Sequence, residues 1–234
     1  MKKNKIIGII QPGRIGDIFL CLPIAKHYYD MGYNIVWPVF HNIYNMFQDR
    51  INYVDFIPVS DNVYSCVDES KKILSNCSCS IIFDIAATFP GSHITGEYIK
   101  QGEGFGEVKF DEFKYNFCQV PFDKKWSLSF ERDEDAENRL YNLYIKEERY
   151  AVIGLNHSQG RARVQIESDK QIVEINEYHN IFDWLKILEN ADQLVLVESA
   201  MSNLVEQINL PNKKWLLRKE GHPMPVYKNK WTIQ

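Results

Sequence analysis

Asp17 is the side chain in this sequence that is best placed to do chemistry. It ends the run Gln11–Asp17 (Gln-Pro-Gly-Arg-Ile-Gly-Asp), which follows five apolar residues and precedes a segment with helical apolar spacing. This order predicts a strand, a glycine turn and a helix, and open α/β sheets bind ligands at such carboxyl ends of strands. A carboxylate there can accept the proton of an attacking hydroxyl. The alternative is a silent acid in the first turn of a helix, where the helix dipole favours it.

A second ligand-type turn, Glu198–Asn203, follows the apolar run Leu194–Val197. Its small residues, among them Ser199 and Ser202, allow a ligand to approach the backbone closely. The first N–H groups of the helix predicted here have no intrahelical acceptor, and the positive end of the helix dipole attracts anions. The turn therefore predicts a phosphate site. The alternative is that Ser199 or Ser202 only caps the helix.

The polar turn His157–Arg163 follows the first strand expected in the second half of the chain. Arg161 and Arg163 carry planar, permanently charged groups that suit phosphate oxygens. In a parallel sheet this turn and Glu198–Asn203 would open on the same edge, so a diphosphate could lie between them. A solvated basic loop is the alternative.

Strand-like and helix-like segments alternate in both halves of the chain. The expected strands are 6–10, 34–39, 54–58, 80–84, 150–156, 171–175, 194–197 and 215–217, and the expected helices are 16–31, 68–74, 133–146, 180–189 and 199–208. This β-α-β order predicts parallel sheets with right-handed crossovers. We expect an α/β fold of two Rossmann-like domains, residues 1–128 and 129–234, with the active site in the cleft between them. The glycine-rich segment Pro90–Phe110 is expected to be a flap or a plain surface loop.

Composition narrows the classes of protein that fit. The chain has 234 residues, 45% of them hydrophobic, and a net charge of −4, so it is not a general polyanion binder. Its five cysteines lack metal or redox spacing, which favours reduced thiols and a cytoplasmic location. The apolar run after the basic start is too short for a signal peptide or a membrane span. The acids Asp133–Asp135 could be mistaken for a metal motif, but acids are favoured in the first turn of a helix.

Two motifs of this sequence, one in each half of the chain, resemble motifs of a known family. Gly13–Asp17, continuing to Leu22-Pro23, resembles the amino-terminal signature of the ADP-heptose–lipopolysaccharide heptosyltransferases, which have the two-domain GT-B fold. Asn190–Pro211 resembles the donor-binding segment of that family, with Glu198, Ala200 and Asn203 where the family usually has Asp, Gly and His. Ser80–Asp84 resembles the strand that leads to the acceptor side. The chain is shorter than is usual for the family and in this is similar to glycosyltransferases encoded by bacteriophages.

The resemblance implies a metal-independent glycosyltransferase that needs no cofactor and uses a nucleotide-sugar donor. Asp17 would be the catalytic base, and the acceptor would be a saccharide or a lipid. The donor would be held in the second domain and the acceptor in the first. The implied donor-side residues are His157, Arg161, Arg163, Glu174 (at the ribose), Glu198, Ser199, Ala200, Met201, Ser202 and Asn203. The implied acceptor-side residues are Gly13, Arg14, Gly16, Asp84, Ser92 and His93.

The basic carboxyl end suggests a different acceptor. Residues 212–234 carry a net charge of +5, from six basic residues against Glu220 alone, interleaved with Trp215, Tyr227 and Trp231. The span Lys213–Lys230 could track phosphates and stack on bases, as in an enzyme that glycosylates hydroxymethylated cytosine in phage DNA. The target base would then be flipped out. A solvated tail is the alternative for this segment, and a non-catalytic nucleotide-sugar binding protein is the alternative for the whole chain.

Overall fold

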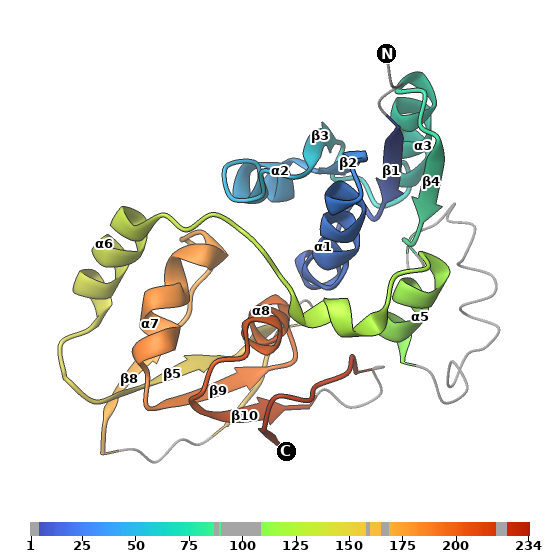
Figure 1. Cartoon of the computed structure of the whole chain (residues 1–234). Coiled ribbons are helices and arrows are strands. Elements are labelled where there is room, and N and C mark those ends of the chain that lie inside the picture. The colour runs from blue at the N-terminus through green and yellow to red at the C-terminus, as the bar shows by residue number, and fades with distance from the viewer. Residues whose placement is uncertain (1–4, 87–88, 90–108, 158–159, 165–168, 219–223) are drawn as a thin grey trace. The chain divides into compact units, whose positions relative to one another are not determined.

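The computed structural model describes residues 5–86, 89, 109–157, 160–164, 169–218 and 224–234 (Figure 1). The chain divides into two compact units, residues 1–131 and 132–234. The boundary expected from the sequence lies between residues 128 and 129. Most of the segment expected to be a flap, and with it Ser92 and His93, lies outside the described residues.

The first unit is built on a parallel four-stranded sheet in the order β3-β2-β1-β4 (Figure 1). Its strands are β1 (Ile6–Ile10), β2 (Asn34–Phe40), β3 (Asp55–Val59) and β4 (Ile81–Asp84). Its helices are α1 (Ile15–Asp30), α2 (His41–Phe47), α3 (Cys66–Asn76) and α5 (Phe110–Phe117), followed by a 3-10 helix, η1 (Phe122–Trp126). Every strand expected in this half is present, whereas α2, α5 and η1 were not expected.

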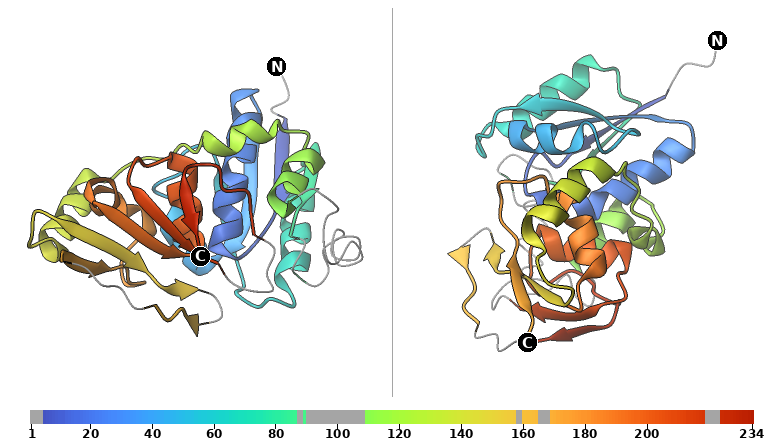
Figure 2. Two further views of the ribbon diagram at one scale, coloured as in Figure 1. Left: turned by 90° about the horizontal axis from the view of Figure 1, so that it is seen from below. Right: turned by 90° about the vertical axis from the view of Figure 1, so that its left-hand side faces the viewer.

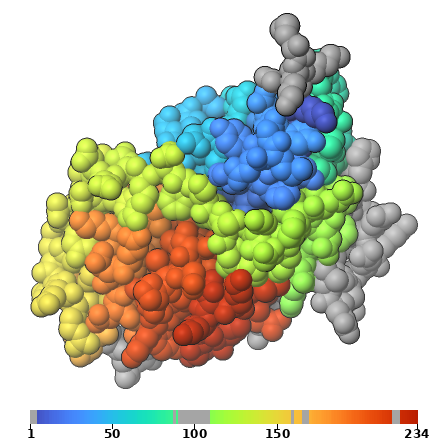
Figure 3. Space-filling model, in the orientation of Figure 1, coloured from blue at the N-terminus to red at the C-terminus, as the bar shows by residue number. Residues whose placement is uncertain are grey.

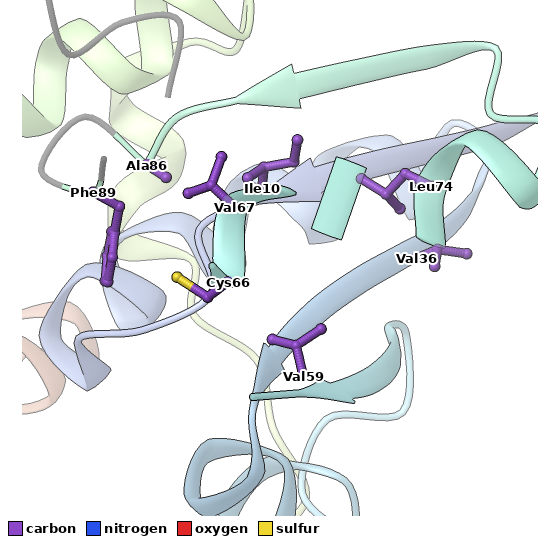
Figure 4. Close-up of a cluster of buried hydrophobic side chains, with 8 residues drawn as sticks. All are labelled: Ile10, Val36, Val59, Cys66, Val67, Leu74, Ala86 and Phe89. Carbon is purple, nitrogen blue, oxygen red and sulfur yellow. The ribbon is translucent and has the colours of Figure 1, made fainter. Parts of the chain in front are cut away.

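One face of the first sheet packs against α3. Gly8 on β1 has no room for a side chain, because a Cβ there would lie 2.8 Å from the Leu74 side chain of α3. Figure 4 shows the buried apolar cluster of this face, which consists of Ile10, Val36, Val59, Cys66, Val67, Leu74, Ala86 and Phe89. The close approach of α3 holds β1 firmly at the centre of the sheet.

Aromatic side chains fill the other face of this sheet. Trp37 of β2 lies 5.9 Å from Phe56 of β3, measured between ring centroids. Phe56 lies 6.1 Å from Phe47 of α2, which in turn lies 5.2 Å from Phe19 of α1. Aromatic pairs at these separations are favourable beyond the area they bury. They anchor α1 on the sheet and place its first turn at the carboxyl end of β1.

The second unit contains a parallel five-stranded sheet in the order β11-β10-β9-β5-β8. Its strands are β5 (Tyr150–Gly154), β8 (Gln171–Glu174), β9 (Gln193–Val197), β10 (Lys213–Leu217) and β11 (Trp231–Ile233). A short antiparallel pair, β6 (Asn156–His157) and β7 (Gly160–Arg161), follows β5. The strand β11 was not expected. The two parallel sheets confirm the predicted α/β class with two Rossmann-like domains.

The helices of the second unit are α6 (Glu134–Tyr144), α7 (Leu185–Asn190) and α8 (Ala200–Ile208), with a 3-10 helix, η2 (Ile181–Trp184), before α7. Figures 1 and 2 show α6, α7 and α8 on one face of the sheet. The buried Tyr150 hydroxyl donates to the Ile187 carbonyl at 2.9 Å and ties β5 to α7. The single helix expected over 180–189 is therefore split, because its first turn is a 3-10 turn. Asn180 caps that turn as predicted, accepting from the Phe182 N–H.

The acidic run before α6 starts a helix, as the sequence predicted. Asp133 caps α6 by accepting from the Ala136 N–H at 2.9 Å, and Glu134 and Asp135 lie in the first turn. All five cysteines are free thiols. None of the described helices combines the length and the apolar character needed to cross a membrane.

Candidate functional site

The turn that carries Asp17 lies where the strand order of the first sheet reverses. The chain runs from β1 outward to β2 and β3 and then returns to β4, on the other side of β1. Ligands of open α/β sheets bind at such a reversal, beyond the carboxyl ends of the strands. Asp84 pairs with Ile10 in the β1–β4 register, so the structure brings Asp84 and the Gly13–Asp17 turn to the same edge.

Gly13 is required by the close packing of this turn. A Cβ at Gly13 would lie 2.3 Å from the ring of Phe40, whose N–H donates to the Pro12 carbonyl at 2.8 Å. Arg14 follows in a left-handed conformation with φ of 62°, which is uncommon for a residue with a side chain. Its exposed guanidinium lies 5.7 Å from the ring centroid of Phe89. The backbone of the turn is thus held in one conformation, and the Arg14 guanidinium places a positive charge beside it.

Asp17 forms an ion pair with Lys114, a residue of α5 that was not predicted from the sequence. The Lys114 ammonium donates to Asp17 Oδ1 at 2.7 Å and to Gln11 Oε1 at 2.9 Å. Only 3% of the Lys114 side chain is exposed, against 18% of the Asp17 side chain. No periodicity or motif marks Lys114 in the sequence, because its partner lies 97 positions away.

The charges around Lys114 overcome the effect of its burial. Burial alone lowers the pKa of a lysine, since the neutral amine is easier to bury. The neighbouring Asp17 carboxylate opposes this, so the pKa of Lys114 lies above its ordinary value. Burial also raises the pKa of the nearby Cys21 thiol to about 12, so this thiol stays protonated and unreactive near neutral pH.

Asp84 is too buried in this structure to contact an acceptor directly. Its side chain is 7% exposed and lies 3.8 Å from the Lys71 ammonium of α3. The structure therefore places Asp84 at the correct edge of the sheet but shows it paired with α3. Asp17 and Arg14 are the more exposed polar groups of this edge.

The two turns predicted to bind the donor both open at one edge of the sheet in the second unit. β5 and β9 are neighbours, and the strand order of this sheet reverses between them. The turn Glu198–Asn203 follows β9, and the residues up to Arg163 follow β5. Both turns therefore lie beyond the carboxyl ends of adjacent strands, the place where this type of sheet binds ligands.

The first turn of α8 is partly occupied by its own side chains. The Ser199 N–H donates to Ser202 Oγ at 2.9 Å, and Ser202 Oγ donates to the Ser199 carbonyl at 2.9 Å. Ser199 was expected to offer its N–H to a diphosphate, but that N–H is already used for capping. Ala200 and Met201 are the first two residues of the helix, and their N–H groups have no intrahelical acceptor. The anion-binding potential of the turn rests on these two groups.

Arg161 and Glu174 pair with each other at the same edge. The Arg161 guanidinium donates to both carboxylate oxygens of Glu174, to Oε2 at 2.9 Å, and both side chains are substantially exposed. The hydrogen bond from Arg161 lowers the pKa of Glu174. Arg163 is exposed nearby, and His157 pairs with Gly160 in the β6–β7 hairpin.

The carboxyl-terminal segment packs on α8 and reaches its first turn. The Tyr227 hydroxyl lies 2.9 Å from Ser202 Oγ and donates to Asn203 Oδ1 at 3.2 Å. One turn further along, the fully buried Glu206 accepts from the Trp231 indole N–H at 2.8 Å. Figure 3 shows the orange residues of α8 and the red residues of the carboxyl-terminal segment as one continuous surface. Tyr227 is thus a polar group of the donor edge that the sequence suggested only as a base-stacking residue.

The basic carboxyl end is only partly available to an external partner. Lys214 is buried, donates to the Leu210 carbonyl and lies 5.8 Å from the ring centroid of Trp231. Burial lowers the pKa of Lys214. Lys214 and Trp231 are therefore used inside the second unit. The exposed basic residues of the segment are Lys213, Arg218, Lys228 and Lys230, and Lys219 lies outside the described residues.

In the part of the chain that the structure describes, no group of three or more His, Cys, Asp or Glu side chains could hold a metal ion. The metal-independent reaction implied by the resemblance stays a prediction.

Comparison with known proteins finds similarity in structure alone. No protein-family model and no curated protein matches the sequence. A glycosyl transferase family 9 protein from Veillonella parvula has a similar structure, with a TM-score of 0.64 at 9% identity over 99% of this chain and 85% of that chain. The ADP-heptose lipopolysaccharide heptosyltransferase II of E. coli gives 0.58 at 10% identity, over 98% and 90%. The E. coli heptosyltransferase WaaC with ADP gives 0.51 at 12% identity, over 97% and 92%. The chain therefore shares the fold of these GT-B proteins.

Proposed function

We propose that this protein is a glycosyltransferase that moves a sugar from a nucleoside-diphosphate sugar to an acceptor hydroxyl. The observation that carries the proposal is the first turn of α8, which lies at the strand reversal of the second sheet, at the edge where Arg161 also follows β5. The fold supports it, because proteins of the same fold are named as glycosyltransferases, and one of them was solved with ADP. Nucleotide sugars carry the diphosphate that such a helix start attracts.

The proposed donor site uses backbone and side-chain donors together. The N–H groups of Ala200 and Met201 would contact the diphosphate, and the dipole of α8 would add to their attraction. Arg161 would turn from Glu174 to a phosphate oxygen at little cost, because an exposed ion pair contributes at most about 1 kcal/mol. Glu174, once released, would be free to accept a hydrogen bond from the donor ribose.

The chemistry then needs one base and one stabilised leaving group. The acceptor oxygen attacks the anomeric carbon of the donor sugar, and the bond from that carbon to the diphosphate oxygen breaks. The electron pair leaves with the nucleoside diphosphate, whose developing charge the α8 donors and Arg161 stabilise. The proton of the acceptor hydroxyl passes to Asp17. The proposal includes no metal, and the free cysteines fit a reducing cytoplasm.

A saccharide or lipid acceptor is favoured over DNA. Lys214 and Trp231, which a nucleic-acid surface at the carboxyl end would use, are engaged inside the second unit. An enzyme acting on DNA would bind duplex DNA with a steep dependence on salt concentration. The absence of binding at low salt would exclude DNA as the acceptor.

The proposal is tested by measuring the thermal stability of the protein with a panel of nucleotide sugars. A donor that binds the native state raises the melting temperature by mass action. Arg161→Gln should weaken the affinity about tenfold or more, since a charge-assisted hydrogen bond contributes about 1.5–3 kcal/mol. Arg149→Gln is the matched control, because Arg149 also pairs with a carboxylate, Asp192, but precedes β5.

The result that would contradict the proposal is a lack of stabilisation by every nucleotide sugar and nucleoside diphosphate tested. Equal effects of the Arg161→Gln and Arg149→Gln substitutions would refute the placement of the donor at this edge. Donor binding without transfer or slow donor hydrolysis would instead identify a non-catalytic nucleotide-sugar binding protein.

A further inference from the structure

We propose that Lys114 is the positioning residue of the reaction: it holds Asp17 through Oδ1 and so makes Oδ2 the oxygen that takes the acceptor proton. The inference rests on the proposed function and adds to it a residue and an atom. Lys114 would act through Asp17 and would not contact the sugars.

The contact between the two residues is one-sided. The Lys114 ammonium lies 2.7 Å from Asp17 Oδ1, and this oxygen is engaged by a charge-assisted hydrogen bond. The lysine does not hold Oδ2. Lys114 is buried and Asp17 is partly exposed, so we infer that Oδ1 points inward, towards the ammonium. A hydroxyl that approaches from solvent would therefore meet Oδ2.

Lys114 also connects the base to the glycine turn. Its ammonium donates to Gln11 Oε1 at 2.9 Å, and Gln11 Nε2 donates to the Gly13 carbonyl at 3.0 Å. Gln11 is itself buried, and its carbonyl accepts from the Trp37 indole at 3.1 Å. The ammonium thus links Asp17 to the backbone of the turn that leads into α1.

The helix that carries Lys114 is fixed by two further buried contacts. Asp111, one turn earlier on α5, pairs with Lys125 at 2.6 Å, and both side chains are fully buried. The Tyr115 hydroxyl donates to the Leu20 carbonyl of α1 at 2.9 Å. A buried ion pair is weak support for stability but can specify one arrangement of its elements. Here it would hold α5 so that the ammonium meets Asp17 without reorganisation, as preorganised sites require.

The test compares Lys114→Met, Lys114→Arg and a surface control in a transfer assay. Lys26→Met is the control, because Lys26 also pairs with an aspartate, Asp30, at 2.5 Å on α1, but at the surface. Lys114→Met should lower kcat about 100-fold, the loss that a displacement of a catalytic group by about 1 Å can cause. Its affinity for the donor nucleotide should stay unchanged, since the donor binds in the second unit. Lys114→Arg should recover part of kcat, and Lys26→Met should leave it unchanged.

The outcomes separate this inference from the proposed function. If the wild-type protein binds no donor, the proposed function fails. If it transfers sugar and a folded Lys114→Met keeps kcat within about twofold, the positioning role is wrong. If Lys114→Met does not fold, Lys114→Arg is the variant that tests the positioning role, because it keeps the buried charge but changes its geometry. A wild-type kcat in Lys114→Arg would also overturn the inference.

Discussion

Replacing Asp17 by asparagine should destabilise the first unit, and by an amount that depends on pH. The substitution keeps the size of the side chain but removes the charge that faces the buried Lys114 ammonium. Asp17 is also the proposed base, so the same variant will be used to test catalysis. Its stability must therefore be understood before a loss of activity can be interpreted.

The size of the loss in stability depends on whether the buried Lys114 ammonium stays charged in the variant or releases its proton. Breaking a buried ion pair by removing one partner costs about 3–5 kcal/mol when the remaining charge stays buried. The lysine can instead release its proton, which at pH 7 costs about 4–5 kcal/mol. This cost is about 1.4 kcal/mol for each pH unit between pH 7 and the ordinary lysine pKa of about 10.4. At pH 9 the same release costs only about 2 kcal/mol. The two routes agree on a loss of about 3–5 kcal/mol at pH 7, and the second predicts a smaller loss at pH 9.

The sign of the pH dependence differs between the two proteins. In the wild type the pKa of Lys114 is raised, so its contribution to stability is complete below the unfolded-state value and is lost as the pH rises through the folded-state value. In Asp17→Asn the raising effect of the Asp17 carboxylate is lost, and burial, the largest effect on Lys114, then lowers its pKa. The unfolded chain then binds more protons, so the stability of the variant rises from pH 7 towards pH 10.

Urea unfolding at pH 7 and pH 9 measures both effects. The double variant Asp17→Asn with Lys114→Met should regain most of the stability, because it removes the unpaired buried charge that the single variant leaves. A loss below about 1 kcal/mol at pH 7, or a loss that does not shrink at pH 9, would show that Lys114 is not buried against Asp17 as described.

Three further predictions concern the turn, the donor edge and the carboxyl-terminal strand. Gly13→Ala would place a carbon 2.3 Å from the ring of Phe40, and the strain should cost about 1–3 kcal/mol in urea unfolding; a wild-type midpoint would contradict this packing. Tyr227→Phe should weaken nucleotide binding measured by calorimetry, whereas Tyr178→Phe, at a side chain 92% exposed, should not; equal affinities would separate Tyr227 from the donor edge. Glu206→Ala should speed amide hydrogen exchange in β11 and cost about 2 kcal/mol, because two partly buried donors lose their acceptor; unchanged exchange would rule out this anchor.

The central strands and the turns after them could be predicted because local signals agree there. Ile6–Ile10 and Leu194–Val197 are short apolar runs, and each is followed by small or polar residues and then a helix. This pattern determines the strand, its direction and the edge at which the turn opens. The carboxyl ends of these two strands and the cap at Asn180 were predicted correctly because they depend on a few neighbouring residues, whereas several other predicted strand ends differ from the structure by one or two residues.

The elements that were missed depend on contacts between distant parts of the chain. The helix α5 carries the buried charges Asp111 and Lys114, which read in sequence as solvent-facing residues and are stable inside only because Lys125 and Asp17 meet them. The strand β11 is three residues long and is held by the buried Glu206 of α8. A charged side chain shows no sign in the sequence that it will be buried, so these features could not be predicted from the sequence.

The central claim is that a nucleoside diphosphate binds at the first turn of α8. It is tested most directly by following the backbone amide resonances of the 15N-labelled protein during titration with ADP, UDP, GDP and CDP. We predict that one of these nucleotides shifts the amides of Ala200 and Met201 most strongly, together with residues after β5, because these N–H groups would contact the diphosphate. Saturable binding that leaves the amides of Ala200 and Met201 unmoved, or no binding by any of the four nucleotides, would contradict the claim.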